Sequence, residues 1–165
     1  MRPVLVCLVL VVSVAVSAAE LTWQQINREI TETFPGAKVI TIGDLKTKLK
    51  NKAPMVLVDV RDKPEYDVSH IQGAVHITRA SEIVRRYGSY PGMVVVYCSV
   101  GYRSGDMAQQ LGRAGMTRVF NLKGSIFKWV NRGNPVVNKH GDATVVHPYN
   151  PYWGQLLKKR FHSPK

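Results

Sequence analysis

The segment from Cys98 to Arg103, CSVGYR, combines residue types that suit chemistry at sulfur. Cys98 supplies a thiol, which is a nucleophile in its thiolate form. Gly101 can adopt the positive φ that turns successive backbone N–H groups toward one point, and such a group of donors binds an anion. Arg103 adds a permanent positive charge. The spacing therefore predicts a reactive cysteine inside an anion-binding loop.

A strand and a helix flank this loop. Residues 93–97, MVVVY, form an apolar run that is typical of a strand buried on both faces. Residues 104–114 place apolar side chains at helical spacing and end at Gly115. The start of a helix has free N–H groups and a positive potential, which favour a thiolate. We expect Cys98 at the carboxyl edge of a parallel sheet, where ligands bind in open α/β folds.

Strands and helices alternate along the rest of the chain. We expect further strands at residues 39–41, 55–60, 74–77 and 118–122. We expect further helices at residues 21–34, 43–50, 63–69, 79–87 and 125–131. This order predicts an α/β fold, with an open parallel five-stranded sheet, helices on both faces, an N-terminal helix and a C-terminal extension.

The first 19 residues have the pattern of a secretory signal peptide. Arg2 precedes an apolar run at residues 4–16, which ends in small residues. The run is shorter than the roughly 20 residues that span a bilayer, so cleavage is favoured over a retained anchor. We expect an exported, periplasmic or secreted protein that has no stable membrane insertion after cleavage. Its parts would be an N-terminal helix at 20–36, one domain at 37–137 and an extension at 138–165.

Cys98 would be the one cysteine left after cleavage, because Cys7 lies in the apolar run. Exported proteins normally pair cysteines in disulfides, so a lone thiol indicates a reactive group or an intermolecular partner. An inert buried thiol is the alternative, but burial explains neither Gly101 nor Arg103. A single cysteine and histidines without paired spacing do not make a zinc site, so we assign no metal and no cofactor.

The chain has 23 Lys and Arg against 11 Asp and Glu, and the excess is uneven. Residues 20–78 hold eight basic and eight acidic residues, whereas residues 79–139 hold ten basic and two acidic ones. This pattern favours small anionic ligands, with a solvated basic face as the alternative. No nucleic acid is expected as a partner, because the longest basic run is 158–160 and aromatic residues do not alternate with the charges.

The extension at 138–165 contains two prolines around Tyr149 and then a short apolar and basic patch. Trp153, Leu156 and Leu157 would lie on one side of a helical turn. We interpret the extension as a strap packed on the domain, with a membrane or partner contact as the alternative. A domain of this size with one core can stand alone, so we expect a monomer.

Three separated blocks resemble the single-domain rhodaneses, a family of thiosulfate and other sulfane-sulfur transferases. In order, they are VLVDVRDKPEYDVSHIQGAVHI, VVVYCSVGYRS and GRAGMTRVFNLKGSIFKWVNRGNPV. The resemblance implies that Cys98 takes a sulfur from a small anionic donor, holds it as a persulfide and passes it to a thiol or other acceptor. It also implies a cradle for the charged sulfur, made by the backbone N–H groups of Ser99, Val100, Gly101, Tyr102 and Arg103. Arg103 would orient the donor.

The resemblance extends to four residues before the loop. Asp59 and Arg61 match an Asp-x-Arg motif, and Glu65 and His70 match an acid and a histidine in the next segment. The implied roles are structural, with an acid and arginine pair and a histidine that ties loops together; catalysis by His70 is the alternative. The chain departs from the family pattern at Ser69 and Ser125, where glycines are common.

Loop length distinguishes two chemistries within the resemblance. Cys98 and Arg103 enclose four residues, as in sulfurtransferases, whereas related phosphatases have one residue more. The short loop favours sulfur transfer over phosphatase activity or arsenate reduction. A binding or redox-sensing module that keeps the fold without catalysis is the alternative function.

Overall fold

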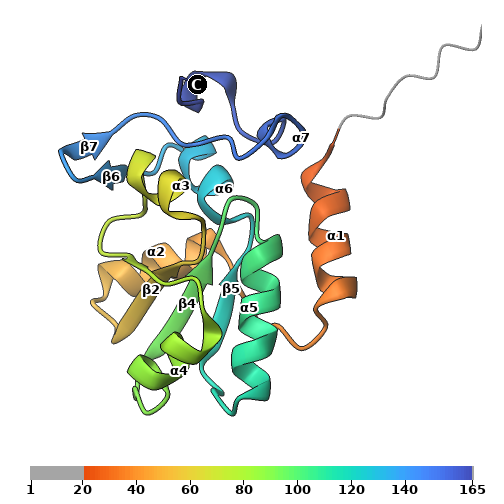
Figure 1. Cartoon of the computed structure of the whole chain (residues 1–165), viewed down its shortest axis with the longest axis vertical. Coiled ribbons are helices and arrows are strands. Elements are labelled where there is room, and N and C mark those ends of the chain that lie inside the picture. Colours follow the sequence, from red (N-terminus) through yellow and green to blue (C-terminus); the bar gives the residue numbers. More distant parts are fainter. Residues whose placement is uncertain (1–20, 165) are drawn as a thin grey trace, which may run out of the picture.

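The structure is a computed structural model and describes residues 21–164. The predicted signal peptide at residues 1–19 lies outside this range. The described chain folds around a parallel sheet with the strand order β1-β5-β4-β2-β3 (Figure 1). The strands are β1 (Val39–Ile40), β2 (Met55–Asp59), β3 (Val75–His76), β4 (Met93–Tyr97) and β5 (Val119–Leu122). This arrangement confirms the predicted open five-stranded α/β fold.

Strand β4 lies at the centre of the sheet because both of its faces are apolar. Val95 and Tyr97 join the hydrophobic cluster on one face, while Val94 and Val96 join the cluster on the other. This alternation is the two-residue period of a strand. Asp59 at the end of β2 pairs in register with Tyr97 at the end of β4, so the segments that follow both strands begin at one edge of the sheet.

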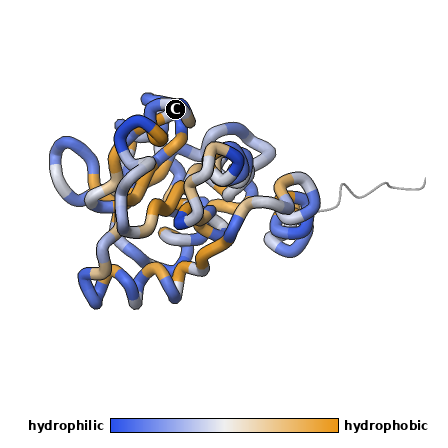
Figure 2. Tube along the Cα trace, turned by 90° about the horizontal axis from the view of Figure 1, so that it is seen from below, coloured by the Kyte–Doolittle hydropathy of each residue, from blue (hydrophilic) through white to orange (hydrophobic). Residues whose placement is uncertain are grey.

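Helices cover both faces of the sheet. Buried residues of α2 (Ile42–Lys50) and α6 (Ser125–Asn131) join the cluster on one face, and those of α4 (Ala80–Tyr87) and α5 (Tyr102–Arg113) join the cluster on the other. Helix α3 (Lys63–Val68) follows β2, and α1 (Trp23–Thr33) lies beside α5 (Figure 1). Figure 2 shows the apolar segments inside and the hydrophilic ones around them.

The predicted boundaries of these strands and helices agree with the structure to within two residues. One difference affects the candidate loop: α5 begins at Tyr102, not at Ser104. Gly101 is the residue before the helix and has a φ of 115°, so the chain turns directly into the helix there. Tyr102 and Arg103 therefore belong to the first turn of α5.

The C-terminal extension has more structure than the sequence indicated. Two short antiparallel strands, β6 (Val136–Asn138) and β7 (Gly141–Ala143), form a hairpin that was not predicted and that begins two residues before the predicted extension at 138–165. Helix α7 (Pro151–Gly154) and a 3₁₀ turn (Lys159–Phe161) follow. Figure 1 shows the extension across one end of the domain, close to α3 and α6.

The extension packs on the domain through buried apolar side chains. Val146, Leu156 and Leu157 belong to the same core cluster as Phe127 of α6. Trp153 lies closer to the surface and packs against that cluster. These contacts agree with the interpretation of the extension as a strap. Across residues 21–164, the helices are too short or too polar to cross a membrane.

Candidate active site

The loop after β4 holds the Cys98 thiol against the protein interior. Cys98 is only 1% exposed, and its Sγ accepts a hydrogen bond from the Gly101 N–H group at 3.2 Å. The positive φ of Gly101 allows this bond, and a Cβ atom at Gly101 would lie 3.3 Å from Ile30 Cδ1. The conformation therefore favours glycine at this position, and a Cβ would fit only if the Ile30 side chain shifted.

Two carbonyl groups of the loop accept hydrogen bonds from the first turn of α6. The Cys98 and Ser99 carbonyls accept the N–H groups of Ile126 and Phe127 at 3.2 and 3.0 Å. Within residues 21–164, the structure shows no acceptor for five other N–H groups of the loop and the helix start, those of Ser99, Val100, Tyr102, Arg103 and Ser104. Helix starts leave such donors free, and they can bind an anionic ligand.

Side chains behind the loop hold its backbone in place. Asn121 of β5 donates from Nδ2 to the Gly101 carbonyl at 2.9 Å, and its Oδ1 accepts from the Ser104 hydroxyl at 2.7 Å. The Ser125 hydroxyl accepts the Cys98 N–H group at 3.1 Å. Ser125, which replaces a common glycine, therefore supports the cysteine directly. Its backbone φ of 48° is one that glycine adopts more readily.

Arg103 is held by acidic side chains from α3 and the residue before it. Its guanidinium donates to the two carboxylate oxygens of Glu65 at 2.7 and 2.8 Å, to Asp62 at 3.3 Å and to the Ser99 hydroxyl at 3.1 Å. Although burial raises the pKa of Glu65, the hydrogen bonds and charge of Arg103 lower it overall. The charged pair joins the first turn of α5 to α3.

Asp59 and Arg61 form a second ion pair, which is fully buried. Arg61 donates from Nε and Nη2 to the Asp59 carboxylate at 2.9 and 2.6 Å, and from Nη2 to the Ser69 carbonyl at 2.6 Å. Burial lowers the pKa of Arg61, but the adjacent Asp59 raises it overall. This pair therefore fixes the segment between β2 and α3, next to the residues that hold Arg103.

His70 makes its contacts away from the thiol. Its ring stacks on Tyr66 at 3.9 Å between centroids, its Nδ1 lies 3.1 Å from the Tyr66 carbonyl, and its backbone pairs with Val137. The ring nitrogen and the backbone thus join α3 to β6. The structural and catalytic roles implied for His70 both remain predictions, and the geometry favours the structural one.

A cavity of about 220 Å³ opens beside Cys98. The residues that line it are Cys98, Ser99, Val100, Tyr102, Arg103, Tyr149 and Trp153. Tyr149 and Trp153 come from the extension and were not predicted as site residues. Their signal in the sequence is the aromatic cluster YNPYW, which lies outside the alternation of strands and helices.

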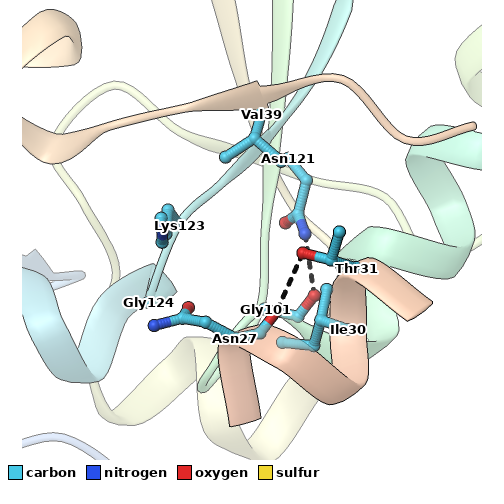
Figure 3. Close-up of a pocket in the computed structure, with 8 residues that line it drawn as sticks. All are labelled: Asn27, Ile30, Thr31, Val39, Gly101, Asn121, Lys123 and Gly124. Atoms are coloured by element: carbon cyan, nitrogen blue, oxygen red, sulfur yellow. Dashed lines mark hydrogen bonds between the residues drawn. The ribbon is translucent and has the colours of Figure 1, made fainter. Parts of the chain in front are cut away.

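A smaller cavity of about 120 Å³ lies behind the loop, between α1 and β5 (Figure 3). Gly101 and Asn121 line it, together with Asn27 and Thr31 of α1. Cys98 does not line this cavity, so we do not assign it to chemistry at the thiol. Within residues 21–164, the structure shows no group of three or more His, Cys, Asp or Glu side chains that could hold a metal ion.

Comparison with known proteins finds one family that covers both most of the sheet and the loop after β4. Residues 41–132, more than half of the chain, match the family model described as a rhodanese-like domain. The chain belongs to this family. The rhodanese-like match includes β2, β4, β5 and the loop from Cys98 to Arg103, whereas α1 and the C-terminal extension lie outside it.

Relatives of the rhodanese-like domain include a named sulfurtransferase. The thiosulfate sulfurtransferase GlpE of Glaesserella parasuis serovar 5 is 37% identical over 83 residues, which cover 49% of this chain and 76% of the relative. A rhodanese-like domain from Anabaena sp. is 27% identical, with a TM-score of 0.52, over 61% of this chain and 78% of that one. A rhodanese-related protein from Thermoplasma volcanium is 25% identical, with a TM-score of 0.51, over 61% of this chain and 97% of that one.

Proposed function

We propose that the protein is a sulfurtransferase that moves a sulfane sulfur from thiosulfate or a similar donor to a thiol or other acceptor. The observation that carries the proposal is the thiol of Cys98, which accepts the Gly101 N–H group and lies among N–H groups that are free to bind an anion. Membership of the rhodanese-like family and a relative named thiosulfate sulfurtransferase support it.

The proposed reaction has two steps at one sulfur atom. In the first, the Cys98 thiolate attacks the outer sulfur of thiosulfate, the donor S–S bond breaks, and sulfite leaves with the electron pair. In the second, an acceptor thiolate attacks the outer sulfur of the Cys98 persulfide and leaves as a new persulfide, which restores the Cys98 thiolate. Loop N–H groups stabilise the negative charge on sulfur in both states.

Two measurements test this proposal. Purified protein should release sulfite from thiosulfate when a thiol acceptor is present, and Cys98→Ser should abolish that release. Mass spectrometry after exposure to thiosulfate alone should find one added sulfur atom on Cys98. Sulfite release at the normal rate by the Cys98→Ser variant would contradict the assignment of the nucleophile.

The cavity beside Cys98 supports a second candidate, a binding or redox-sensing module. The thiol is only 1% exposed but lines this cavity, through which a small oxidant can reach it. Sensing predicts sulfenic acid or a mixed disulfide with glutathione on Cys98 after mild oxidation. It also predicts no added sulfur after thiosulfate treatment, so the mass of Cys98 separates the two functions.

A further inference from the structure

The C-terminal extension forms one wall of the cavity beside Cys98. The Tyr149 ring lies over the Arg103 guanidinium, 4.5 Å from its central carbon to the ring centroid. The ring centroid of Trp153 lies 6.2 Å from that of Tyr102, which packs edge-on against Phe34 at 5.1 Å. Aromatic side chains from outside the matched family range therefore face the reactive sulfur across a small space.

This wall is fixed between anchored segments of the extension. Before it, the Ser69 hydroxyl donates to the Val145 carbonyl at 2.7 Å, and the next residue, Val146, is fully buried. After it, Asn131 of α6 donates from Nδ2 to the Leu156 carbonyl at 2.7 Å. The two aromatic residues are thus held at both ends, as a binding surface requires.

The backbone of Tyr149 is in an unfavourable conformation. Its φ is 64°, a region that glycine and asparagine adopt more readily than an aromatic residue. The side chain is 41% exposed, so burial in the core does not account for a tyrosine there. Unfavourable backbone conformations of this kind concentrate at ligand sites. We attribute the conformation to the position that it gives the ring, over Arg103 and beside the cavity.

The charge around the cavity disfavours a doubly charged donor. Arg103 is the one charged side chain among the lining residues, and Glu65 and Asp62 already balance its charge. Tyr149 covers the guanidinium as well. The attraction for an anion therefore comes mainly from the loop N–H groups, which carry partial positive charges. These partial charges suit a donor with a single negative charge, located on the sulfur that is transferred.

The rest of the cavity suits a small apolar group. Its walls are the side chains of Val100, Tyr102, Tyr149 and Trp153. The volume of about 220 Å³ is below the roughly 300 Å³ at which pockets for drug-sized ligands begin, so the group is about the size of one aromatic ring. Aromatic rings gain from stacking and edge contacts with such walls.

We infer that Tyr149 and Trp153 select the sulfur donor, favouring an organic thiosulfonate, R–SO₂–S⁻, over inorganic thiosulfate. This inference rests on the proposed function, because it names the donor class of the same cysteine. The Cys98 thiolate attacks the terminal sulfur of the donor, and the S–S bond to the sulfonyl group breaks. The products are the Cys98 persulfide and the sulfinate R–SO₂⁻, which takes the electron pair.

The test measures how fast Cys98 gains sulfur without an acceptor. Full-length protein is mixed with thiosulfate or with benzenethiosulfonate, and the added sulfur is followed by mass spectrometry to give a second-order rate constant for each donor. Each rate constant is divided by the rate constant of the same donor with a small free thiol. After this correction, we expect benzenethiosulfonate to react about tenfold faster than thiosulfate, because each aromatic contact contributes up to about tenfold in affinity. Tyr149→Ala and Trp153→Ala should each reduce this preference severalfold, because the benzenethiosulfonate rate should fall more than the thiosulfate rate.

Two further variants separate the wall from general stability. Tyr152→Phe is the matched control, because it keeps the edge contact of this ring with Trp153 at 5.2 Å between centroids, and Tyr152 is 54% exposed and does not line the cavity. It should keep the preference. Trp153→Phe should keep most of the donor preference. If Trp153→Ala does not fold, the donor preference of Tyr149→Ala tests the inference instead.

The outcomes distinguish this inference from the function on which it rests. Failure of both donors to load Cys98 would overturn the proposed sulfurtransferase itself. Loading of the wild type without preference, or with a preference that neither Tyr149→Ala nor Trp153→Ala changes, would overturn the inference and leave sulfur transfer intact. An effect of these variants on the acceptor step alone would also overturn it.

Discussion

Replacing Gly101 by alanine tests whether the loop conformation produces the proposed reactivity of Cys98. At a φ of 115° an alanine is strained, at about 1–3 kcal/mol, and its Cβ would lie 3.3 Å from Ile30 Cδ1. We expect Gly101→Ala to lower the free energy of unfolding by about 2 kcal/mol, measured by urea denaturation. Any backbone shift that relieves the strain also moves the Gly101 N–H group from Cys98 Sγ, so persulfide formation should slow by about a hundredfold.

Two other glycines of the chain serve as controls for Gly101→Ala. Gly115 has a φ of 88° with open space around it, so Gly115→Ala should cost about 1 kcal/mol of stability without slowing persulfide formation. Gly112 lies inside α5 with open space, so Gly112→Ala should stabilise the protein by about 0.5–1 kcal/mol. A Gly101→Ala protein that forms the persulfide at the wild-type rate would refute the argument that this N–H group supports the thiolate.

Three other side chains give predictions that urea denaturation and proteolysis can check. Asp59→Asn leaves the buried Arg61 charge unpaired and should cost about 3–5 kcal/mol, whereas an unchanged urea midpoint would contradict a buried pair. Glu65→Gln should cost about 2 kcal/mol at pH 7, because Arg103 is partly exposed and keeps Asp62. The pKa of Glu65 is lower in the folded protein than in the unfolded chain. The ionised Glu65 therefore stabilises the fold fully above its unfolded pKa of about 4.3, and this contribution is lost as the pH falls through the folded pKa. Glu65→Gln lacks this contribution, so it should lose less stability on acidification than the wild type. Ser69→Ala removes the hydrogen bond to the Val145 carbonyl, which should lower the free energy of unfolding by about 1 kcal/mol and speed proteolysis within the extension. An unchanged rate of proteolysis would show that this bond does not hold the extension on the domain.

The sheet and its helices could be predicted because their signals are local. A strand buried on both faces must be continuously apolar, as at residues 93–97, and the helices end at residues such as Gly115 that break the pattern. The sequence predicts a start for α5 that is two residues late, for a related reason. Tyr102 and Arg103 do not fit the apolar helical spacing, and the helix begins where Gly101 turns the chain.

The contacts that complete the site could not be predicted, because they join distant parts of the chain. Glu65 and Arg103 pair across 38 positions, and neither residue type identifies its partner in advance. Strands β6 and β7 have three residues each, which is too short for a periodic pattern, and the hairpin is also tied to His70 through Val137. Tyr149 and Trp153 reach the cavity only because Val146 and Leu156 are buried on either side of them.

The geometry also changes the role that we expect of Arg103. The resemblance implied that this guanidinium orients an anionic donor, but its hydrogen bonds go to Glu65, Asp62 and Ser99. A guanidinium with these partners has little capacity left for a ligand, whereas it holds the first turn of α5 against α3. That turn carries the free N–H groups beside Cys98. Arg103 would then act as a positioning residue, and the charge of the transferred sulfur would be stabilised by the backbone of the loop.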